Sequence, residues 1–394
     1  MNYILFDDSR WSQFLPLTHT RPVSELRCGI LTMKTRWEKI LSASCSNLTQ
    51  AYLQEKFPLA SGQDNMLLNG GIFATAELYG AIEKLQPNEA LVQNDLLIAC
   101  RISGEQLNNT RLPEINSLNT LHWEGSVMQL SNLWDLFSLN DQAIRLDYTL
   151  LTAGRASAPL PEGNQVIGKD LFIEEGAQVY ASVINTTSGP VYLAKDSEVM
   201  EGSLIRGPFA LGEQAVLKMG AKIYGATTIG PGCKVGGEVN NSVFFSNSNK
   251  AHDGFIGNAV IGEWCNIGAD SNNSNLKNNY EEVKLWSESK KSFVKTGLQF
   301  CGLIFGDHSK CGINTMFNTG TVVGVSCNIY GAGFPRNFIP SFSWGSANGF
   351  MEYQIHKAID TASRVFARRK LPFDEVEQRL LQTVFEHTAE QRNY

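Results

Sequence analysis

The sequence lacks the features of a membrane protein and of a nucleic-acid-binding protein. No stretch approaches the about 18 uncharged apolar residues that a membrane-spanning helix needs. The N-terminal segment MNYILFDDSRW has no basic stretch followed by a long apolar run. The net charge is −6, so no large basic field is available to neutralise nucleic-acid phosphates. We therefore expect a cytoplasmic protein whose partners are small molecules or proteins, and neither nucleic acid nor a membrane.

The sequence also lacks paired cysteines. Its eight cysteines are scattered and form no C-x-x-C pair. Without such a pair, and in a reducing cytosol, buried thiols are favoured over zinc sites and disulfides. We expect reduced thiols that are buried as small hydrophobic residues. Charged residues make up only 18 %, while the 35 glycines indicate a globular chain with many tight corners.

A strict six-residue period dominates the middle of the chain. Its aliphatic members are Val199, Ile205, Leu211, Leu217, Ile223, Ile229 and Val235. This period fits neither a helix nor an ordinary strand, and hexapeptide repeats are typical of the parallel β-helix. The series continues in pieces at Ile167, Ile173, Val179, Phe255, Ile261, Ile267, Phe305, Phe317, Val323 and Ile329. It predicts one solenoid over about residues 163–335.

Residues 1–155 show no such period and predict a separate α/β unit. The expected strands are 2–8, 65–71 and 88–100, and the expected helices are 38–57 and 74–85. This alternation favours a parallel sheet, whose ligands bind beyond the carboxyl ends of its strands. Three strand ends carry polar residues, namely Asp7, Asp8 and Arg10, then Asn69 and Gly70, then Asn94 and Asp95.

Residues 15–40 form a donor-rich loop that leads into a helix. The donors are Thr18, Thr20, Arg21, Arg27 and Lys34. Hydroxyls, guanidinium groups and an ammonium beside a helix start are suited to a polyphosphate. The alternative is a solvated basic loop followed by ordinary helix surface.

The domain boundaries follow from composition. An amphipathic helix pair over 130–150 is expected to pack the first domain on the second, and the Gly- and Pro-rich segment 154–164 is the expected linker. The charged segment 276–296 falls outside the period and predicts a protruding loop. After Pro340, two helices separated at Leu371–Pro372 are expected to cap the solenoid. The predicted domains are 1–155, 156–340 and 341–394.

Two of the six histidines lie in the solenoid, His252 and His308. A neutral imidazole can take the proton of an amine or hydroxyl that attacks a thioester. We favour His252 as this general base. A hydrogen-bonded histidine at a coil corner is the alternative for both, and we favour it for His308.

The run 248–276, SNKAHDGFIGNAVIGEWCNIGADSNNSNL, resembles the acetyltransferase motif of the bifunctional N-acetylglucosamine-1-phosphate uridyltransferase and glucosamine-1-phosphate acetyltransferase family. The resemblance implies a left-handed β-helix, acetyl-CoA as acyl donor and a homotrimer with sites at its interfaces. Position by position, it implies His252 as the base, Phe255 and Asn266 beside the sugar, Asn275 on the neighbouring-subunit side and Lys222 as the phosphate ligand. Asn240 stands where the family has a lysine.

The run 6–38, FDDSRWSQFLPLTHTRPVSELRCGILTMKTRWE, resembles an alternative sugar-nucleotidyltransferase start in bacterial proteins of this two-domain layout. It implies that a sugar 1-phosphate oxygen attacks the α-phosphorus of a nucleoside triphosphate, with Mg²⁺ screening the charge. Asp95 matches the metal-binding aspartate. The expected nucleotide-binding residues are Arg10, Thr18, Arg21, Arg27, Lys34 and Asn69.

Together these features predict an enzyme of amino-sugar nucleotide synthesis. It would transfer acetyl from acetyl-CoA to a hexosamine 1-phosphate, and a nucleotidyl group from a triphosphate such as UTP to the sugar 1-phosphate. Loop 276–296 would be a lid over a neighbouring subunit. One alternative is an acyltransferase for another amino sugar, with a nucleotide-binding but non-catalytic first domain. Another is a trimeric scaffold.

Overall fold

A computed structural model describes residues 1–107, 112 and 114–394. The chain forms two compact units. The N-terminal unit comprises 1–14, 20–26 and 31–132, and the solenoid unit comprises 15–19, 27–30 and 133–394. Because the second unit includes 133–394, most of the helix pair expected over 130–150 belongs to the solenoid unit. It is present as α3 (Asp135–Ser138) and α4 (Asn140–Thr152).

The N-terminal unit is built on one six-stranded sheet of order β2-β1-β3-β5-β4-β6. Its strands are β1 (Asn2–Phe6), β2 (Cys45–Leu48), β3 (Asp64–Asn69), β4 (Glu89–Gln93), β5 (Leu96–Ser103) and β6 (Asn119–His122). The parallel sheet expected from the sequence is wrong in one respect, because β5 runs antiparallel to both of its neighbours. The single strand predicted over 88–100 is a hairpin that turns at Asn94, whose φ is +51°.

The helix predicted over 38–57 was also too long. The helix α1 (Met33–Leu41) begins at a Thr32 capping box and ends at Ser42, which adopts a left-handed conformation. The residues beyond it form β2, which pairs with the buried β1. The helix predicted over 74–85 is present as α2 (Ala76–Ile82), capped by Thr75. The strand predicted over 88–100 and the helix predicted over 38–57 were both too long for the same reason. In each, one residue with a left-handed conformation, Asn94 or Ser42, reverses a chain that local propensity alone would have continued.

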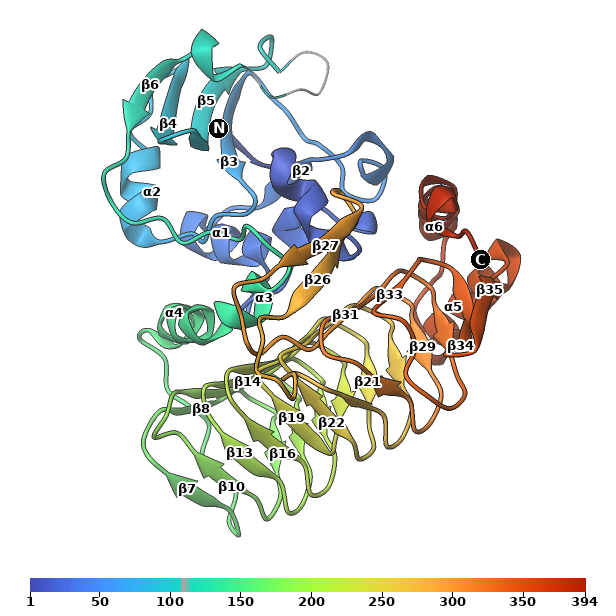
Figure 1. The fold of residues 1–394 in the computed structure, drawn as a ribbon. Helices are drawn as coiled ribbons and strands as arrows, with labels where there is room; N and C mark the ends of the chain where they lie inside the picture. The colour runs from blue at the N-terminus through green and yellow to red at the C-terminus, as the bar shows by residue number, and fades with distance from the viewer. Residues whose placement is uncertain (108–111, 113) are drawn as a thin grey trace. The chain divides into compact units, whose positions relative to one another are not determined.

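The solenoid unit is a left-handed parallel β-helix, as expected. Three sheets line its coils, which stack from green to orange in Figure 1. The first face contains β7 (Gln165–Ile167), β10 (Val183–Asn185), β13 (Leu204–Arg206), β16 (Lys222–Tyr224), β19 (Glu238–Asn240) and β22 (Phe255–Gly257). The second face contains β8 (Leu171–Ile173), β11 (Val191–Leu193), β14 (Phe209–Leu211), β17 (Thr227–Ile229), β20 (Val243–Phe244), β23 (Val260–Ile261), β28 (Leu303–Phe305), β31 (Thr321–Val323) and β33 (Phe338–Ile339).

The third face carries the remaining coil strands and ends in an antiparallel strand. It contains β9 (Gln178–Val179), β12 (Glu198–Val199), β15 (Val216–Leu217), β18 (Lys234–Val235), β21 (Asn249–Lys250), β24 (Asn266–Ile267), β29 (Lys310–Cys311), β32 (Asn328–Ile329), β34 (Ser343–Ser346) and β35 (Gly349–Glu352). Two short strands, β25 (Asn272–Asn273) and β30 (Met316–Phe317), form a separate pair.

The six-residue step is invariant at only one of the three corners. From each inward residue of the second face to the next inward residue of the third face, the chain always advances six positions. The third residue before each inward third-face position has a positive φ. We call this column the left-handed corner; it comprises Gly176, Asp196, Gln214, Gly232, Asn247, Trp264, His308, Ser326 and Phe342.

The other corners vary in length, so two members predicted for the inward series are wrong. Ile256 is fully buried while Phe255 is half-buried on the outside of the coil. At the start of the solenoid, Val166 packs against the core and Ile167 is 42 % exposed. A corner that is one residue longer or shorter moves the next side chain to the opposite face of its strand.

The solenoid core is one continuous apolar cluster. It includes four cysteines, and all eight cysteines of the chain are free and buried, as expected. Burial raises the pKa of the Cys233 thiol to about 12. These thiols therefore serve as small core residues and are poorly ionised at neutral pH.

The segment 276–296 leaves the coil as predicted, and it forms an antiparallel hairpin of β26 (Lys284–Ser287) and β27 (Ser292–Lys295). Its Trp286 ring stacks on Phe338 at 4.7 Å. The buried Glu288 carboxylate contacts His19 Nε2 at 2.9 Å and accepts a hydrogen bond from Gln391. The hairpin is thus anchored to the chain from which it protrudes.

Segment 27–30 joins the solenoid unit through backbone hydrogen bonds. The Gly29 N–H donates to the buried Asn140 side chain, and Thr228 donates to the Gly29 carbonyl. The Ile30 N–H donates to Asp147 of α4 at 2.8 Å. These bonds satisfy buried backbone groups that would otherwise be costly to bury.

The chain ends in α5 (Ile355–Arg368) and α6 (Glu375–His387), with the predicted break at Leu371–Pro372 between them. The expectation that these helices cap the open end is wrong for α5, which lies along the left-handed corner. Its Phe366 stacks on Trp264 at 3.8 Å, and the following Arg369 donates to the carbonyls of Gly232 and Asn247. Among the described residues, no helix is both long and apolar enough to cross a membrane.

The remaining short helices are 3₁₀ segments. They are η1 (Ser9–Phe14), η2 (Leu17–His19), η3 (Val23–Glu25), η4 (Ala51–Leu53), η5 (Ile115–Ser117) and η6 (Ala389–Gln391).

Candidate functional site

Polar side chains meet at the carboxyl edge of the N-terminal sheet. Asp8 follows β1 and Asn69 ends the neighbouring β3, and Asn69 Nδ2 donates to Asp8 Oδ2 at 2.9 Å. The Arg10 guanidinium binds the same carboxylate, with Nε 2.9 Å from Asp8 Oδ2, and also donates to Gln129. The structure therefore brings together Arg10 and Asn69, two of the residues predicted to bind a nucleotide.

The two adjacent aspartates at this edge have different electrostatic environments. Burial raises the pKa of Asp7 to about 7, although hydrogen bonds from Thr49 and from the Val23 N–H act in the opposite direction. Burial also acts to raise the pKa of Asp8, but hydrogen bonds from Arg10 and Asn69 outweigh it and the pKa is lowered. At neutral pH the site combines an ionised Asp8 with an Asp7 that is close to its titration midpoint.

The other predicted nucleotide ligands are not gathered in one unit. Arg21 and Lys34 belong to the N-terminal unit, where Arg21 is buried and Lys34 Nζ pairs with Glu25 at 3.2 Å. Thr18 and Arg27 belong to the solenoid unit. Thr18 is fully buried there, and Arg27 donates to the Ile30 carbonyl. The fold thus divides a loop that the sequence presents as one donor cluster.

Asp95 is exposed in the turn that joins β4 to β5. It is the second residue after β4 ends at Gln93, so its predicted strand-end position holds although the chain turns back there. The described residues contain no group of three or more His, Cys, Asp or Glu side chains arranged to hold a metal. Mg²⁺ bound mainly by water and substrate phosphates needs only one or two carboxylates, and one exposed aspartate fits that requirement.

In the solenoid unit, His252 is exposed in a bend that follows β21. Lys250 holds this bend, because its Nζ donates to the carbonyls of His252 and Asp253. Lys250 is only 1 % exposed and occupies the inward position that an aliphatic residue fills in other coils. Our sequence reasoning missed Lys250, although counting six residues on from Phe244 points to it. Burial lowers the pKa of Lys250 to about 8.

The other residues assigned by resemblance lie on different faces. Phe255 and Asn275 both approach Gly257, where an added Cβ would lie 2.5 Å from the Phe255 ring and 2.8 Å from Asn275 Nδ2. Asn275 Nδ2 also donates to Asn258. Asn266 lies on the third face, beside Asn249. The structure therefore brings Phe255 and Asn275 together, while Asn266 lines a different surface.

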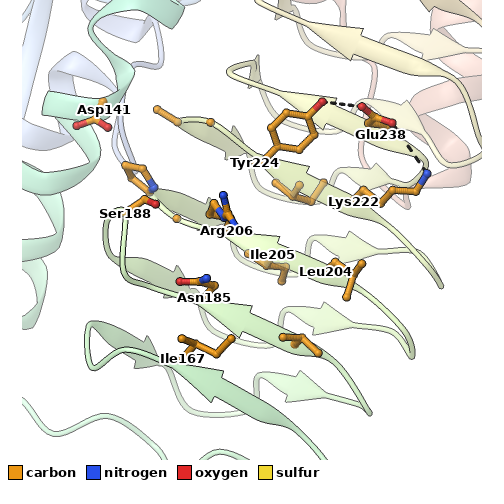
Figure 2. Close-up of a pocket in the computed structure, with 16 residues that line it drawn as sticks. Asp141, Ile167, Asn185, Ser188, Leu204, Ile205, Arg206, Lys222, Tyr224 and Glu238 are labelled. Carbon is orange, nitrogen blue, oxygen red and sulfur yellow. Dashed lines mark hydrogen bonds and ion pairs between the residues drawn. The ribbon is translucent and has the colours of Figure 1, made fainter.

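Lys222 lies in a pocket on the first face, shown in Figure 2. The pocket has a volume of about 770 Å³ and an aliphatic floor that includes Leu204. Lys222 Nζ lies 3.9 Å from Glu238 Oε2, and the Tyr224 hydroxyl donates to Glu238 Oε1 at 2.6 Å. Burial is the main cause of the raised pKa of Tyr224, and the hydrogen bond to Glu238 raises this pKa further. With Arg206 also on this face, the pocket could hold an anionic group against an apolar surface.

The N-terminal part of the chain is similar to a known family of transferases. Residues 3–156 match the family model described as sugar nucleotidyl transferase. The chain thus carries a domain similar to sugar nucleotidyl transferases, followed by a left-handed β-helix. No curated protein matches the chain significantly.

Solved structures that match the chain include several acyltransferases. A UDP-N-acetylglucosamine acyltransferase from Arabidopsis is 16 % identical, with a TM-score of 0.25 and coverage of 59 % of this chain and 94 % of that one. The Campylobacter jejuni enzyme of the same name is 16 % identical, with a TM-score of 0.22 and coverage of 60 % and 92 %. The polySia-specific acetyltransferase NeuO is 15 % identical, with a TM-score of 0.30 and coverage of 53 % and 94 %.

Proposed function

We propose that this chain is a sugar-modifying transferase with two activities. The N-terminal domain would transfer a nucleotidyl group from a triphosphate, with UTP the leading choice, to a sugar 1-phosphate. The solenoid would transfer acetyl from acetyl-CoA to a hexosamine 1-phosphate. The family match over residues 3–156 carries the first activity, and the cluster of Asp8, Arg10 and Asn69 at the sheet edge supports it. The motif around His252 supports the second.

In nucleotidyl transfer, an oxygen of the sugar 1-phosphate attacks the α-phosphorus and pyrophosphate leaves. Asp8 and Gln129 orient the Arg10 guanidinium through three of its five N–H donors, which leaves two for a phosphate. Asn69 holds Asp8 in turn. Asp95 would be the protein ligand of Mg²⁺, which when bound with substrate phosphates neutralises their charge.

In acetyl transfer, the sugar amine attacks the thioester carbonyl and the coenzyme thiolate leaves. The exposed His252 imidazole would take the amine proton, while Lys250 holds the backbone that presents this ring. Phe255 and Asn275, which meet over Gly257, would contact the sugar. Asn266 would also contact the sugar, and Lys222 would bind its phosphate. Family resemblance further suggests a homotrimer, in which the β26–β27 hairpin would reach a neighbouring subunit.

The nucleotidyl activity is tested by pyrophosphate release from triphosphates, sugar 1-phosphates and Mg²⁺. We expect Asp95→Asn to reduce the rate about 100-fold or more, because a required charge is lost. The exposed Glu83→Gln of the same unit is the control and should keep the wild-type rate. If the wild-type chain neither reacts with nor binds any triphosphate, the nucleotidyl proposal fails.

The acetyl activity is tested by thiol release from acetyl-CoA in the presence of glucosamine 1-phosphate. Loss of a general base should lower kcat about 10²- to 10⁴-fold in His252→Ala. The exposed His356→Ala in α5 should be unaffected. Unchanged turnover in His252→Ala would remove His252 from the mechanism. A thermal-shift screen with acetyl-CoA and UDP-sugars separates both activities from a scaffold role, since a scaffold should respond to neither.

A further inference from the structure

A second cavity lies between the third face of the solenoid and α5, away from the pocket that contains Lys222. Its volume is about 350 Å³. Four cationic side chains and three asparagines line it, together with Trp264, Cys265 and Val365, and no carboxylate is among the lining residues. The cations are Lys234, Lys310, Arg368 and Arg369, and the asparagines are Asn247, Asn249 and Asn266.

The polar floor of the cavity is a row of paired residues on successive strands of the third face. Lys234 pairs with Asn249, Asn249 with Asn266, and Asn266 with Lys310 on successive strands. Asn249 Nδ2 donates to Asn266 at 3.3 Å, and among the described residues the buried Asn249 Oδ1 has no hydrogen-bond partner. Two ammonium groups thus flank two amides, and the Nδ2 group of each amide has at least one N–H left to donate to an anion.

The cations converge without neutralising partners. Lys310 Nζ donates to the His308 carbonyl at 2.7 Å, and Arg369 donates to two corner carbonyls. Lys234 and Arg368 are exposed. In the part of the chain that the structure describes, none of these four side chains forms an ion pair. Burial lowers the pKa of Lys310 to about 8, which is the direction expected for a buried ammonium group.

The helix dipole offers another explanation for Arg368 and Arg369, because the C-terminal end of a helix such as α5 favours cationic side chains even without a bound anion. That explanation does not extend to the two lysines, which lie on strands of the solenoid. The wall of the cavity that α5 provides is held in place, because Phe366 of α5 stacks on Trp264 of the coil. Like charges gathered around one cavity repel one another, and an anion bound between them would offset that repulsion.

We propose that this cavity binds a small oxyanion of the phosphate or diphosphate class. Arg368 and Arg369 supply planar N–H donors, Lys234 and Lys310 supply point charges, and the asparagine amides complete the hydrogen bonding. The anion can be free in solution or be the diphosphate of a coenzyme. One lining residue, Asn266, is also proposed to contact the sugar, whereas His252 and the Lys250 that holds its bend are not among the lining residues.

Titration calorimetry of the full-length chain with inorganic pyrophosphate tests the site, in low salt and with EDTA to suppress metal-dependent binding elsewhere. Lys234→Gln and Arg368→Gln, singly and combined, remove exposed charges and should leave the fold intact by circular dichroism. We expect the double variant to bind at least about tenfold more weakly, because two charge-assisted contacts are lost. Arg364→Gln is the matched control on the same helix, since Arg364 pairs with Asp360 outside the cavity.

The proposal is overturned if wild-type protein binds no pyrophosphate at millimolar concentration, or if the double variant and the control bind equally. Coenzyme A is the second probe. Competition with pyrophosphate, weakened by the same two substitutions, identifies the coenzyme as the source of the anion. Pyrophosphate binding without such competition identifies a free anion. His252→Ala should not change pyrophosphate affinity, so failure of acetyl transfer and failure of this site are distinguishable.

Discussion

Replacing the buried Lys250 by methionine should change how stability depends on pH. In the unfolded chain this lysine has its ordinary pKa of 10.5, and in the fold the pKa is about 8. Between these pH values the unfolded chain binds more protons, so the stability of the wild-type protein rises with pH. Methionine has a similar volume and no charge, so Lys250→Met should lose this part of the pH dependence.

The size of the effect follows from the two pKa values. When both states are fully protonated, a shift from 10.5 to about 8 costs the fold about 3 kcal/mol. The cost declines as the pH passes 8, and between pH 7 and pH 9 it falls by about 1.3 kcal/mol. The wild-type protein should therefore gain about 1.3 kcal/mol more stability over this interval than Lys250→Met.

Equilibrium urea unfolding at pH 7 and pH 9, followed by circular dichroism, measures this difference. The exposed Lys195→Met is the control and should follow the wild type. Equal pH dependence in Lys250→Met and wild type would refute the inference that Lys250 is buried as a strained cation. Hydrogen exchange adds a local test. Without the Nζ bonds to their carbonyls, the backbone amides around His252 and Asp253 should exchange faster in the variant.

Three further outcomes are expected in urea unfolding. Leu217→Ala in the solenoid core should cost about 2–5 kcal/mol, whereas Leu204→Ala, at a position 51 % exposed, should cost less than about 1 kcal/mol. The pKa of Asp7 is raised to about 7, so its ionisation makes stability fall between pH 4 and pH 7; Asp7→Asn should abolish that fall, of about 4 kcal/mol at most. Gly29→Ala should destabilise strongly, because its Cβ would lie 2.4 Å from a carboxylate oxygen, whereas Gly220→Ala meets nothing within 4 Å and should cost only the about 1–2 kcal/mol of a left-handed residue.

Much of the solenoid was predictable because its period is local. Each coil repeats one pattern of inward aliphatic residues, and a spacing of six is visible without knowledge of distant contacts. The register errors at Ile167 and Phe255 occurred where corners change length, which periodicity alone cannot reveal. The interruption of the solenoid by 276–296 was visible, but its hairpin pairing was not.

The N-terminal sheet was less predictable because its topology depends on single turn residues. Asn94 and Ser42 adopt left-handed conformations that reversed the expected strand and ended the expected helix. The pairing of Asp8 with Asn69 could be anticipated, since the two residues lie at the carboxyl ends of neighbouring parallel strands. The assignment of Thr18 and Arg27 to the solenoid unit could not, because it depends on tertiary packing.

The left-handed corner has a consequence for how this chain can change in length. Deleting 197–214 would join Asp196 to Ala215 and leave every later side chain facing as before, so the solenoid would be one coil shorter. Deleting one residue between Leu211 and Leu217 would instead turn the next third-face strand inside out. The solenoid can therefore be shortened only by whole coils. Its length can change in steps of one coil while the inward-facing side chains of the remaining coils stay as they are.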